Sequence, residues 1–189
     1  MSMVYSDGST LMLTKMIEDT VDSIHKFSHK DAVAFGKQMR IWQRMMDEIV
    51  GPATYFPPMP SLDLVVTMQK TEIGRELIEL NEMSPLAIMK EHFGNDKLRA
   101  LLLYASCMWG LHPDETGLGL FVPLLLTRAM DKAVLVGGSH KLAGAFAREI
   151  VRNGGMILDA TQANKIIMEN GQVTGVDTWE GRTLHSKVV

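Results

Sequence analysis

Two pairs of glycines are the residues of this chain whose type and spacing most directly suggest chemistry. Gly137 and Gly138 open an amphipathic segment, and Gly154 and Gly155 close it. A glycine-rich turn that leads into a helix can bring backbone N–H groups onto a phosphate, so a nucleotide site is the first hypothesis. However, the dinucleotide fingerprint G-x-G-x-x-G is not met from Gly137, Gly138 or Gly117, and no GxxxxGK[ST] motif occurs. We therefore predict a mechanical role, in which the first pair turns a strand into a helix and the second pair ends that helix.

Cysteine and histidine provide the next candidates, for nucleophilic or metal chemistry. Cys107 is the only cysteine and lies in the apolar run "LLLYASCMWG", where it is expected to be a small hydrophobic residue rather than a nucleophile. His25 and His29 have the spacing of two metal ligands on a helix. Ser28, however, is expected to start a new helix between them, and no third ligand is near in sequence. We interpret them as two surface histidines that do not share a face.

Two polar stretches complete the search for reactive groups. The "HPDE" stretch at 112–115 could supply metal ligands, but it is more simply a loop whose carboxylates favour the N-terminus of the next helix. Ser139 and His140 are adjacent, which does not make a catalytic triad, and no GxSxG motif occurs. The sequence therefore predicts no metal site and indicates no catalytic residue.

Composition limits the classes of partner. The net charge of −3 and a pI of about 6.1 argue against nucleic acid as a partner. The 15 methionines indicate either an adaptable apolar pocket or methionine replacing leucine in an ordinary core. A single cysteine excludes an intrachain disulfide and favours a reducing, cytoplasmic location. The N-terminus lacks the features of a signal peptide, and the longest apolar runs are too short to span a membrane, which leaves peripheral membrane contact open.

The first two thirds of the chain have helical patterns. "VYSDGSTLML" predicts a β-hairpin, and Leu13 to Ile24 follow at helical spacing. Ser28 is expected to cap a long helix, with Asp31 returning the bond as in a capping box. Apolar residues then step by three and four from Ala32 to Ile49, which predicts a helix that ends at Gly51-Pro52. The proline-rich stretch 51–61 is expected to be a loop, and helical signals resume around 77–80. Ser84 is expected to cap a helix with Pro85 at its first position, a buried helix is indicated at 97–111, and an apolar segment follows at 120–130.

The last third of the chain is rich in residues that favour β-strands. The sequence predicts the order β-α-β-β-β in this part of the chain. A strand would precede Gly137, a helix would lie between the glycine pairs, and short strands would follow from Met156 onward, with turns at 170–171 and 180–181. Leu142, Phe146 and Ile150 would face the sheet, and Val188-Val189 would lie inside a strand. The fold class is therefore predicted as α+β. Residues 1–133 form a mostly helical lobe with an N-terminal hairpin, and residues 134–189 form the β-α-β-β-β part.

The order of these elements resembles a known family. "VGGSHKLAGAFAREIVRNGGMILDATQANKIIMENGQVTGVDTWEGRTLHSKVV" is similar to the middle of FAD-dependent phytoene dehydrogenases and flavin amine oxidases. "YSDGSTLMLTKMIEDTVDSIHKFSHKDAVAFGKQM" and "SPLAIMKEHFGNDKLRALLLYASCMWGL" resemble helices of the substrate domain in that superfamily. The resemblance covers essentially the whole chain, and it implies that 1–133 is a substrate-binding lobe and 134–189 part of an FAD-type α/β domain.

The resemblance also implies a cofactor and candidate site residues. Members hold FAD through an N-terminal GxGxxG unit and a C-terminal glycine-rich segment, and neither is found here. We therefore expect the chain to be the inner part of a larger enzyme, or one subunit of a split protein, that is inactive alone. Ala163 stands where the family has a valine whose backbone meets the adenine, so it is the candidate cofactor-binding residue. Phe121, Leu124 and Leu125 are the candidate substrate-lining residues.

Two functions from different classes follow. The first is the substrate-binding part of an FAD-dependent oxidoreductase that acts on a lipophilic, isoprenoid- or polyene-like substrate, with a complementary chain supplying the dinucleotide-binding domain. The flavin would carry out hydride transfer, which explains why no acid, base or nucleophile stands out. The second is a non-catalytic binding or assembly module that docks a partner polypeptide through an open strand near Val189 and through methionine-rich helices.

Overall fold

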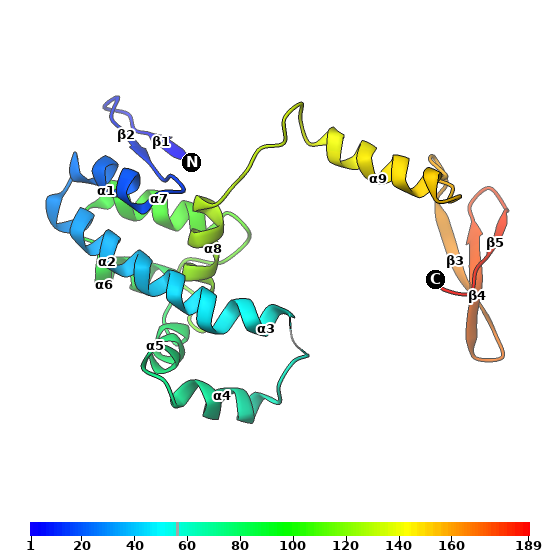
Figure 1. Ribbon diagram of the computed structural model, residues 1–189, viewed down its shortest axis with the longest axis horizontal. Helices are drawn as coiled ribbons and strands as arrows, with labels where there is room; N and C mark the ends of the chain where they lie inside the picture. The colour runs from blue at the N-terminus through cyan, green and yellow to red at the C-terminus, as the bar shows by residue number, and fades with distance from the viewer. Residues whose placement is uncertain (56) are drawn as a thin grey trace. The chain divides into compact units, whose positions relative to one another are not determined.

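The chain divides into two compact units, Met1–Ala133 and Val134–Val189 (Figure 1). The computed structural model describes residues 1–55 and 57–189, so the part of the predicted 51–61 loop that falls on Phe56 lies outside the described residues. Helices dominate the first unit, and both units contain a small antiparallel sheet. The predicted α+β class is confirmed.

The first unit starts with the predicted β-hairpin and continues in helices. Strands β1 (Ser2–Val4) and β2 (Thr10–Met12) pair antiparallel with Met3 opposite Leu11. The helices that follow are α1 (Ile17–His25), α2 (His29–Met45), the π-helical turn η1 (Met46–Val50), α3 (Gly51–Tyr55), α4 (Ser61–Gln69), α5 (Glu72–Asn81), α6 (Pro85–His92), α7 (Asp96–Cys107) and α8 (Phe121–Met130).

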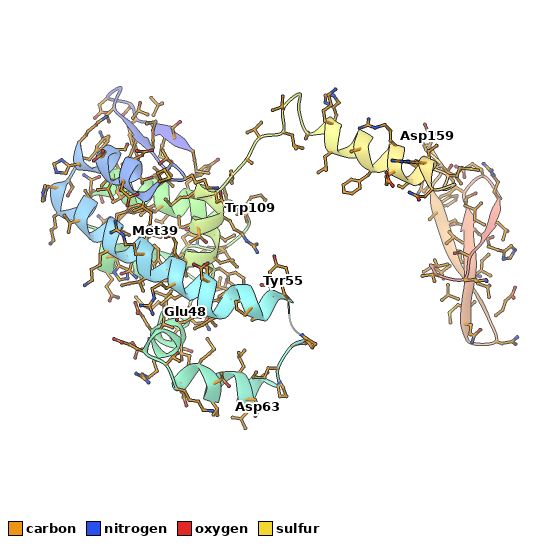
Figure 2. All side chains as sticks on the ribbon, in the orientation of Figure 1. Met39, Glu48, Tyr55, Asp63, Trp109 and Asp159 are labelled. Carbon is orange, nitrogen blue, oxygen red and sulfur yellow. The ribbon has the colours of Figure 1, made fainter. Side chains whose placement is uncertain are left out.

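The core of this unit is built around α2. Its predicted apolar stripe is buried, with Phe35, Met39 and Trp42 fully inaccessible to solvent, and Figure 2 shows Met39 on this helix. Helices α1, α5, α6 and α8 all pack against α2. Leu98, Leu101 and other residues of α7 complete the cluster, as the apolar pattern of 97–111 predicted.

The start of α2 is fixed by a cap and by a long-range contact. The Ser28 hydroxyl accepts a hydrogen bond from the Asp31 backbone N–H at 3.2 Å, which confirms the predicted cap. Asp31 does not return the bond as predicted. Its carboxylate, only 3% exposed, accepts hydrogen bonds from the backbone N–H groups of Gly94 at 2.9 Å and Asn95 at 2.8 Å. Asp31 therefore ties the start of α2 to the segment between α6 and α7, which satisfies two partly buried donors.

The hairpin is attached to α7 through Lys97. The Lys97 ammonium donates to the Asp7 carboxylate and, at 2.8 Å, to the Ser9 hydroxyl. Tyr5 adds a hydrogen bond from its hydroxyl to the Lys97 carbonyl oxygen at 2.5 Å. The hydrogen bond from Lys97 lowers the pKa of Asp7 well below its usual range.

The long helix does not end at Gly51-Pro52 as predicted. It passes through η1 into α3 and reaches Tyr55. The Gly51 N–H donates to the Met46 carbonyl, five residues earlier, which is the spacing of a π-helix. The backbone hydrogen-bond pattern has therefore already departed from that of an α-helix at Pro52, which has no N–H to donate. A Cβ on Gly51 would lie 2.9 Å from the Met46 carbonyl oxygen, so glycine permits this close approach. The π-turn therefore carries the helix across a proline that would break a regular α-helix.

Helix α4 is missing from the sequence-based prediction. Its sequence "SLDLVVTMQ" contains consecutive β-branched residues, Val65 to Thr67, which have low helix propensity. Prolines at 57, 58 and 60 also mark the segment before it as a loop, and residues 57–60 are indeed irregular. Helix α4 follows directly and packs against α5. The proline signal was thus correct for 57–60 but concealed the helix beside it.

The second unit contains helix α9 (His140–Arg152) and the strands β3 (Ala163–Glu169), β4 (Gln172–Thr178) and β5 (Thr183–His185). The strands form an antiparallel sheet in the order β3-β4-β5. The turn at Asn170-Gly171 has positive φ values of 52° and 78°, as its sequence predicted. The predicted β-α-β-β-β pattern is wrong in its first strand, because residues 134–136 are not in a strand, and "MILDA" at 156–160 is not a strand either.

The predicted packing of α9 on a sheet is also wrong. No residue of α9 is buried, and Leu142, Phe146 and Ile150 are 50%, 64% and 43% exposed. Strand β5 ends at His185, so the expected strand at Val188-Val189 does not form. The β-rich stretches 134–136 and 156–160 pair with no strand of the described chain. Without a hydrogen-bonded neighbour, strand propensity alone does not produce a strand.

Candidate functional site

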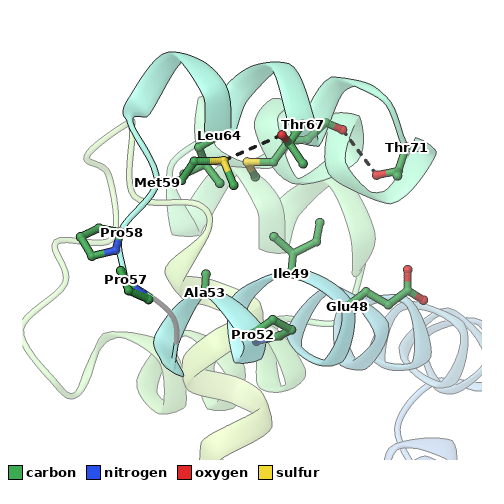
Figure 3. A pocket seen from close by; sticks show the side chains of 11 residues that line it. Glu48, Ile49, Pro52, Ala53, Pro57, Pro58, Met59, Leu64, Thr67 and Thr71 are labelled. Atoms are coloured by element: carbon green, nitrogen blue, oxygen red, sulfur yellow. Dashed lines mark hydrogen bonds between the residues drawn. The ribbon is translucent and has the colours of Figure 1, made fainter.

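A cavity of about 460 Å³ lies between the end of the long helix and α4 (Figure 3). It falls in the size range of small-molecule sites, roughly 300–1,000 Å³. Its walls come from η1, α3, the proline segment, α4 and the residue that caps α5. The lining residues are Glu48, Ile49, Pro52, Ala53, Pro57, Pro58, Met59, Leu64, Thr67, Met68 and Thr71.

One wall of the cavity is formed by the π-turn and α3. Ile49 is half-buried and packs against the core, and Figure 3 shows it pointing toward α4 together with Ala53. The extra residue in a π-turn rotates the downstream helix relative to a regular continuation of the upstream one. Ile49 and Ala53 therefore face the cavity, whereas the stripe of α2 faces the core.

The opposite wall is formed by α4 and the residues before it. Leu64, Thr67 and Met68 line the cavity from α4, and Met59 lines it from the proline segment. Helix α4 has no buried residue and packs mainly against α5. In Figure 2, Tyr55 marks the end of α3 and Asp63 lies on the side of α4 away from it. This wall of the cavity is therefore held in place mainly by the packing of α4 against α5.

The polar groups of the lining already have partners. The Glu48 carboxylate pairs with Arg44 Nε at 3.0 Å. The Thr67 hydroxyl contacts Met59 Sδ at 3.9 Å, and Thr71 Oγ1 donates to the Met68 carbonyl at 3.4 Å. Among the lining residues in the described chain, none is a lysine, arginine or histidine. The cavity is therefore suited to an uncharged, apolar ligand.

A second recess in the same unit differs in chemistry. It measures about 520 Å³ and is lined by Asp47, Arg128 and Asp131, together with Gln43, Met46 and Thr127. Charged groups of both signs surround it, so it offers little to an apolar ligand.

The substrate-lining residues predicted from the resemblance lie elsewhere, on α8. Phe121 is 37% exposed, and Leu124 and Leu125 are half-buried. None of the three lines the 460 Å³ cavity. Helix α8 does pack against η1, which forms part of the cavity wall. Their role as substrate-lining residues stays a prediction.

Ala163, the predicted cofactor-binding residue, is the first residue of β3. It is exposed and pairs with Thr178, and the register shifts between Ala163 and Lys165. Its backbone is thus at the irregular start of a strand. The prediction of a contact with the adenine is neither supported nor contradicted by this geometry.

The first glycine pair forms a turn rather than a phosphate cradle. Gly137 and Gly138 have φ values of 86° and 93°, which favour glycine. The Gly138 N–H already donates to the Leu135 carbonyl oxygen at 2.9 Å, as in a tight turn. Gly154, with a φ of 79°, follows the C-terminus of α9. The mechanical role of the glycines as turn and helix stop is confirmed in this respect, although no strand precedes the turn.

The other reactive groups form no site in residues 1–55 and 57–189. Cys107 ends α7, and burial raises the pKa of its thiol, which disfavours a nucleophilic thiolate. His25 and His29 are exposed, as predicted, but their rings meet edge to face with centroids 4.6 Å apart, so they do share a face. No group of three or more potential metal ligands is found within those ranges. Asp114 and Glu115 lie in a loop well before α8 and do not cap it.

The sequence-based reasoning missed the cavity itself. Most of its lining residues fall in the stretch interpreted as a loop and in α4, which was not predicted. A signal did exist, since Leu62, Leu64, Val65 and Val66 form an apolar cluster directly after three prolines. Where such a cluster is exposed, as Leu62 and Val66 are here, it can mark a ligand-binding groove or an interaction site.

Two curated proteins are similar to this chain over nearly its full length. A limonene dehydrogenase subunit of Castellaniella defragrans is 34% identical over 177 residues, which are 93% of this chain and 32% of that protein. Hydroxyneurosporene desaturase of Cereibacter sphaeroides is 28% identical over 182 residues, 94% of this chain and 36% of that protein. The chain thus spans about a third of the length of these relatives. No protein-family model matches it.

The lengths and hydropathies of the helices bear on membrane insertion. In the part of the chain that is described, no helix is both long enough and apolar enough to cross a membrane.

Proposed function

We propose that this chain is the substrate-binding part of an FAD-dependent oxidoreductase that acts on a lipophilic, isoprenoid-like molecule. One observation carries the proposal, the similarity of 93% of the chain to a protein named as a subunit of limonene dehydrogenase. The second relative is named as a desaturase of hydroxyneurosporene. An apolar cavity in the helical unit agrees with such a substrate.

The chemistry is divided between a cofactor and this chain. FAD, held by a complementary dinucleotide-binding domain, would supply the hydride acceptor or donor. Ala163 would offer a backbone contact on the adenine side. The helical unit would bind and orient the substrate and exclude water from it.

A second candidate function is a non-catalytic assembly module. The exposed apolar face of α9, formed by Leu142, Phe146 and Ile150, favours it, because such a face on a surface helix is normally covered. The two functions are compatible in one molecule, since a subunit that binds substrate must also dock the chain that holds the flavin.

The test is to purify a tagged form of the chain under mild conditions from its own host cells and to record its visible absorption spectrum. The expected result is a flavin absorption band that accompanies a co-purified polypeptide. An isoprenoid hydrocarbon such as limonene, added under anaerobic conditions, should then bleach that band. The matched control is the same chain produced alone in a foreign host, which we expect to show no flavin band.

The outcomes separate the two functions. A flavin band that a hydrocarbon bleaches supports the oxidoreductase. A stable complex with another polypeptide but without flavin would favour the assembly module and refute the oxidoreductase. A chain that turns over substrate without any other polypeptide would refute the division of labour proposed here.

A further inference from the structure

We infer that the 460 Å³ cavity between η1–α3 and α4 is a binding site for an uncharged, unsaturated hydrocarbon, and that Ile49 and Ala53 set its depth. The ligand class rests on the proposed function, whereas the location rests on the structure alone. The site differs from the α8 residues that the sequence pointed to. Helix α8 supports η1 through direct packing but contributes no residue to the cavity lining.

The charge of the lining excludes an ionic ligand. Glu48 is the only ionisable residue among those that line the cavity in the described chain, and Arg44 already neutralises it. A carboxylate or phosphate would find no free cation among the lining residues of the described chain, which is costly in an apolar site. A hydrocarbon places no such demand on the lining.

The shape of the walls favours a ligand of variable geometry. Met59 and Met68 both line the cavity, and methionine side chains are flexible and polarisable. Pro52, Pro57 and Pro58 add rigid apolar surface at no cost in side-chain entropy. The combination of a rigid rim and adaptable sulfur-bearing side chains suits kinked, unsaturated carbon skeletons.

Helix α4 is apolar on the side away from the cavity as well. Its outer surface is also apolar, with Leu62 75% exposed and Val66 44% exposed. Leu64, on the same helix, reaches the cavity. At about 100° per residue, Leu62 and Val66 lie on the side of α4 opposite Leu64 and therefore outside the cavity lining.

The experiment uses the full chain and the uncharged dye Nile red, whose fluorescence rises in apolar surroundings. Ala53→Trp fills the cavity from α3, and Leu64→Trp fills it from α4. The matched control is Val66→Trp, which adds the same indole to α4 outside the lining. We expect each filling variant to weaken dye binding by about tenfold or more, since even one misfitting methylene in an apolar pocket changes binding by roughly 10–200-fold. The control should stay within about twofold, and circular dichroism verifies that each variant is folded.

Competition defines the ligand class. Limonene should displace the dye from the wild-type chain, whereas geranyl diphosphate, an isoprenoid with a charged head, should displace it poorly. Equal binding of the dye by the folded Ala53→Trp and Leu64→Trp variants would overturn the location. Stronger displacement by the diphosphate would overturn the uncharged class. Because the assay needs neither flavin nor a partner, its failure is distinct from a failure of the oxidoreductase proposal.

Discussion

Replacing Gly74 by alanine tests the junction that holds α4 over the cavity. Gly74 lies in α5, and its N–H donates to the Thr71 hydroxyl that caps this helix. In an ordinary helix the change from glycine to alanine stabilises by roughly 0.5–1 kcal/mol. Here the new Cβ would lie 2.0 Å from the Met68 carbonyl oxygen, at the end of α4.

The magnitude follows from this distance. Ordinary contact begins at 3.4 Å, so α4 would have to move by about 1.4 Å to make room. The obstructing atom belongs to the backbone, so a side-chain rotation cannot relieve the clash. Overpacking of this kind costs about 1–3 kcal/mol, which exceeds the gain in helix propensity. We expect Gly74→Ala to lower the unfolding free energy by about 1–2 kcal/mol and to weaken Nile red binding, because Met68 lines the cavity.

The assay is urea unfolding followed by tryptophan fluorescence. Trp42 is fully buried, whereas Trp109 and Trp179 are 66% and 65% exposed, so the change in emission reports mainly on the first unit. The control is Gly144→Ala in α9, where the nearest atom to the new Cβ is Arg148 Nη1 at 3.5 Å. Helical circular dichroism should show that this control is neutral or slightly stabilising. A Gly74→Ala chain as stable as the wild type, with unchanged dye affinity, would refute the reasoning.

Three further predictions concern groups outside the cavity. Asp31→Ala should lower the unfolding free energy by about 3 kcal/mol, because two backbone N–H groups lose a charged partner. Asp31→Asn keeps one acceptor and should lower it by less. Urea unfolding measures both variants. Because the pKa of Asp7 is lowered, its contact with Lys97 stabilises the fold above the ordinary aspartate pKa of about 4, and this stabilisation is lost as the pH falls further. The unfolding free energies of the wild type and Asp7→Asn should therefore differ at pH 7 and converge in strong acid. The raised pKa of Cys107 predicts slower alkylation by iodoacetamide at neutral pH than for a free cysteine; an equal rate would contradict it.

Much of the helical unit could be predicted from local patterns. The stripe of α2, the caps at Ser28 and Ser84 and the N-terminal hairpin all depend on residues close in sequence. The bond expected back from Asp31 was wrong because its carboxylate is used by Gly94 and Asn95, more than sixty residues away. Local patterns cannot anticipate a contact at that separation.

The cavity and the second unit show a different limit. Helix α4 forms in spite of Val65 and Val66, so its packing against α5 overrides its own propensity. Conversely, residues 134–136 have the composition of a strand but no strand to pair with among the described residues. In both cases the neighbour, rather than the segment, decides the structure. The candidate site was therefore missed because it is built from segments whose structure depends most on their neighbours.

The number of residues in the π-turn at Met46–Val50 determines which residues of α3 face the cavity. Each residue advances an α-helix by about 100°, so deleting one residue from this turn would rotate α3 by about that angle. Ala53 would then turn away from α4, and Pro52 would lie in a regular helix that it disrupts. Deletion of Asp47 or Val50, neither of which lines the cavity, would thus abolish the cavity wall, whereas conservative substitutions of the lining residues would only reshape it. Comparisons of related chains at this turn should accordingly consider spacing before residue identity.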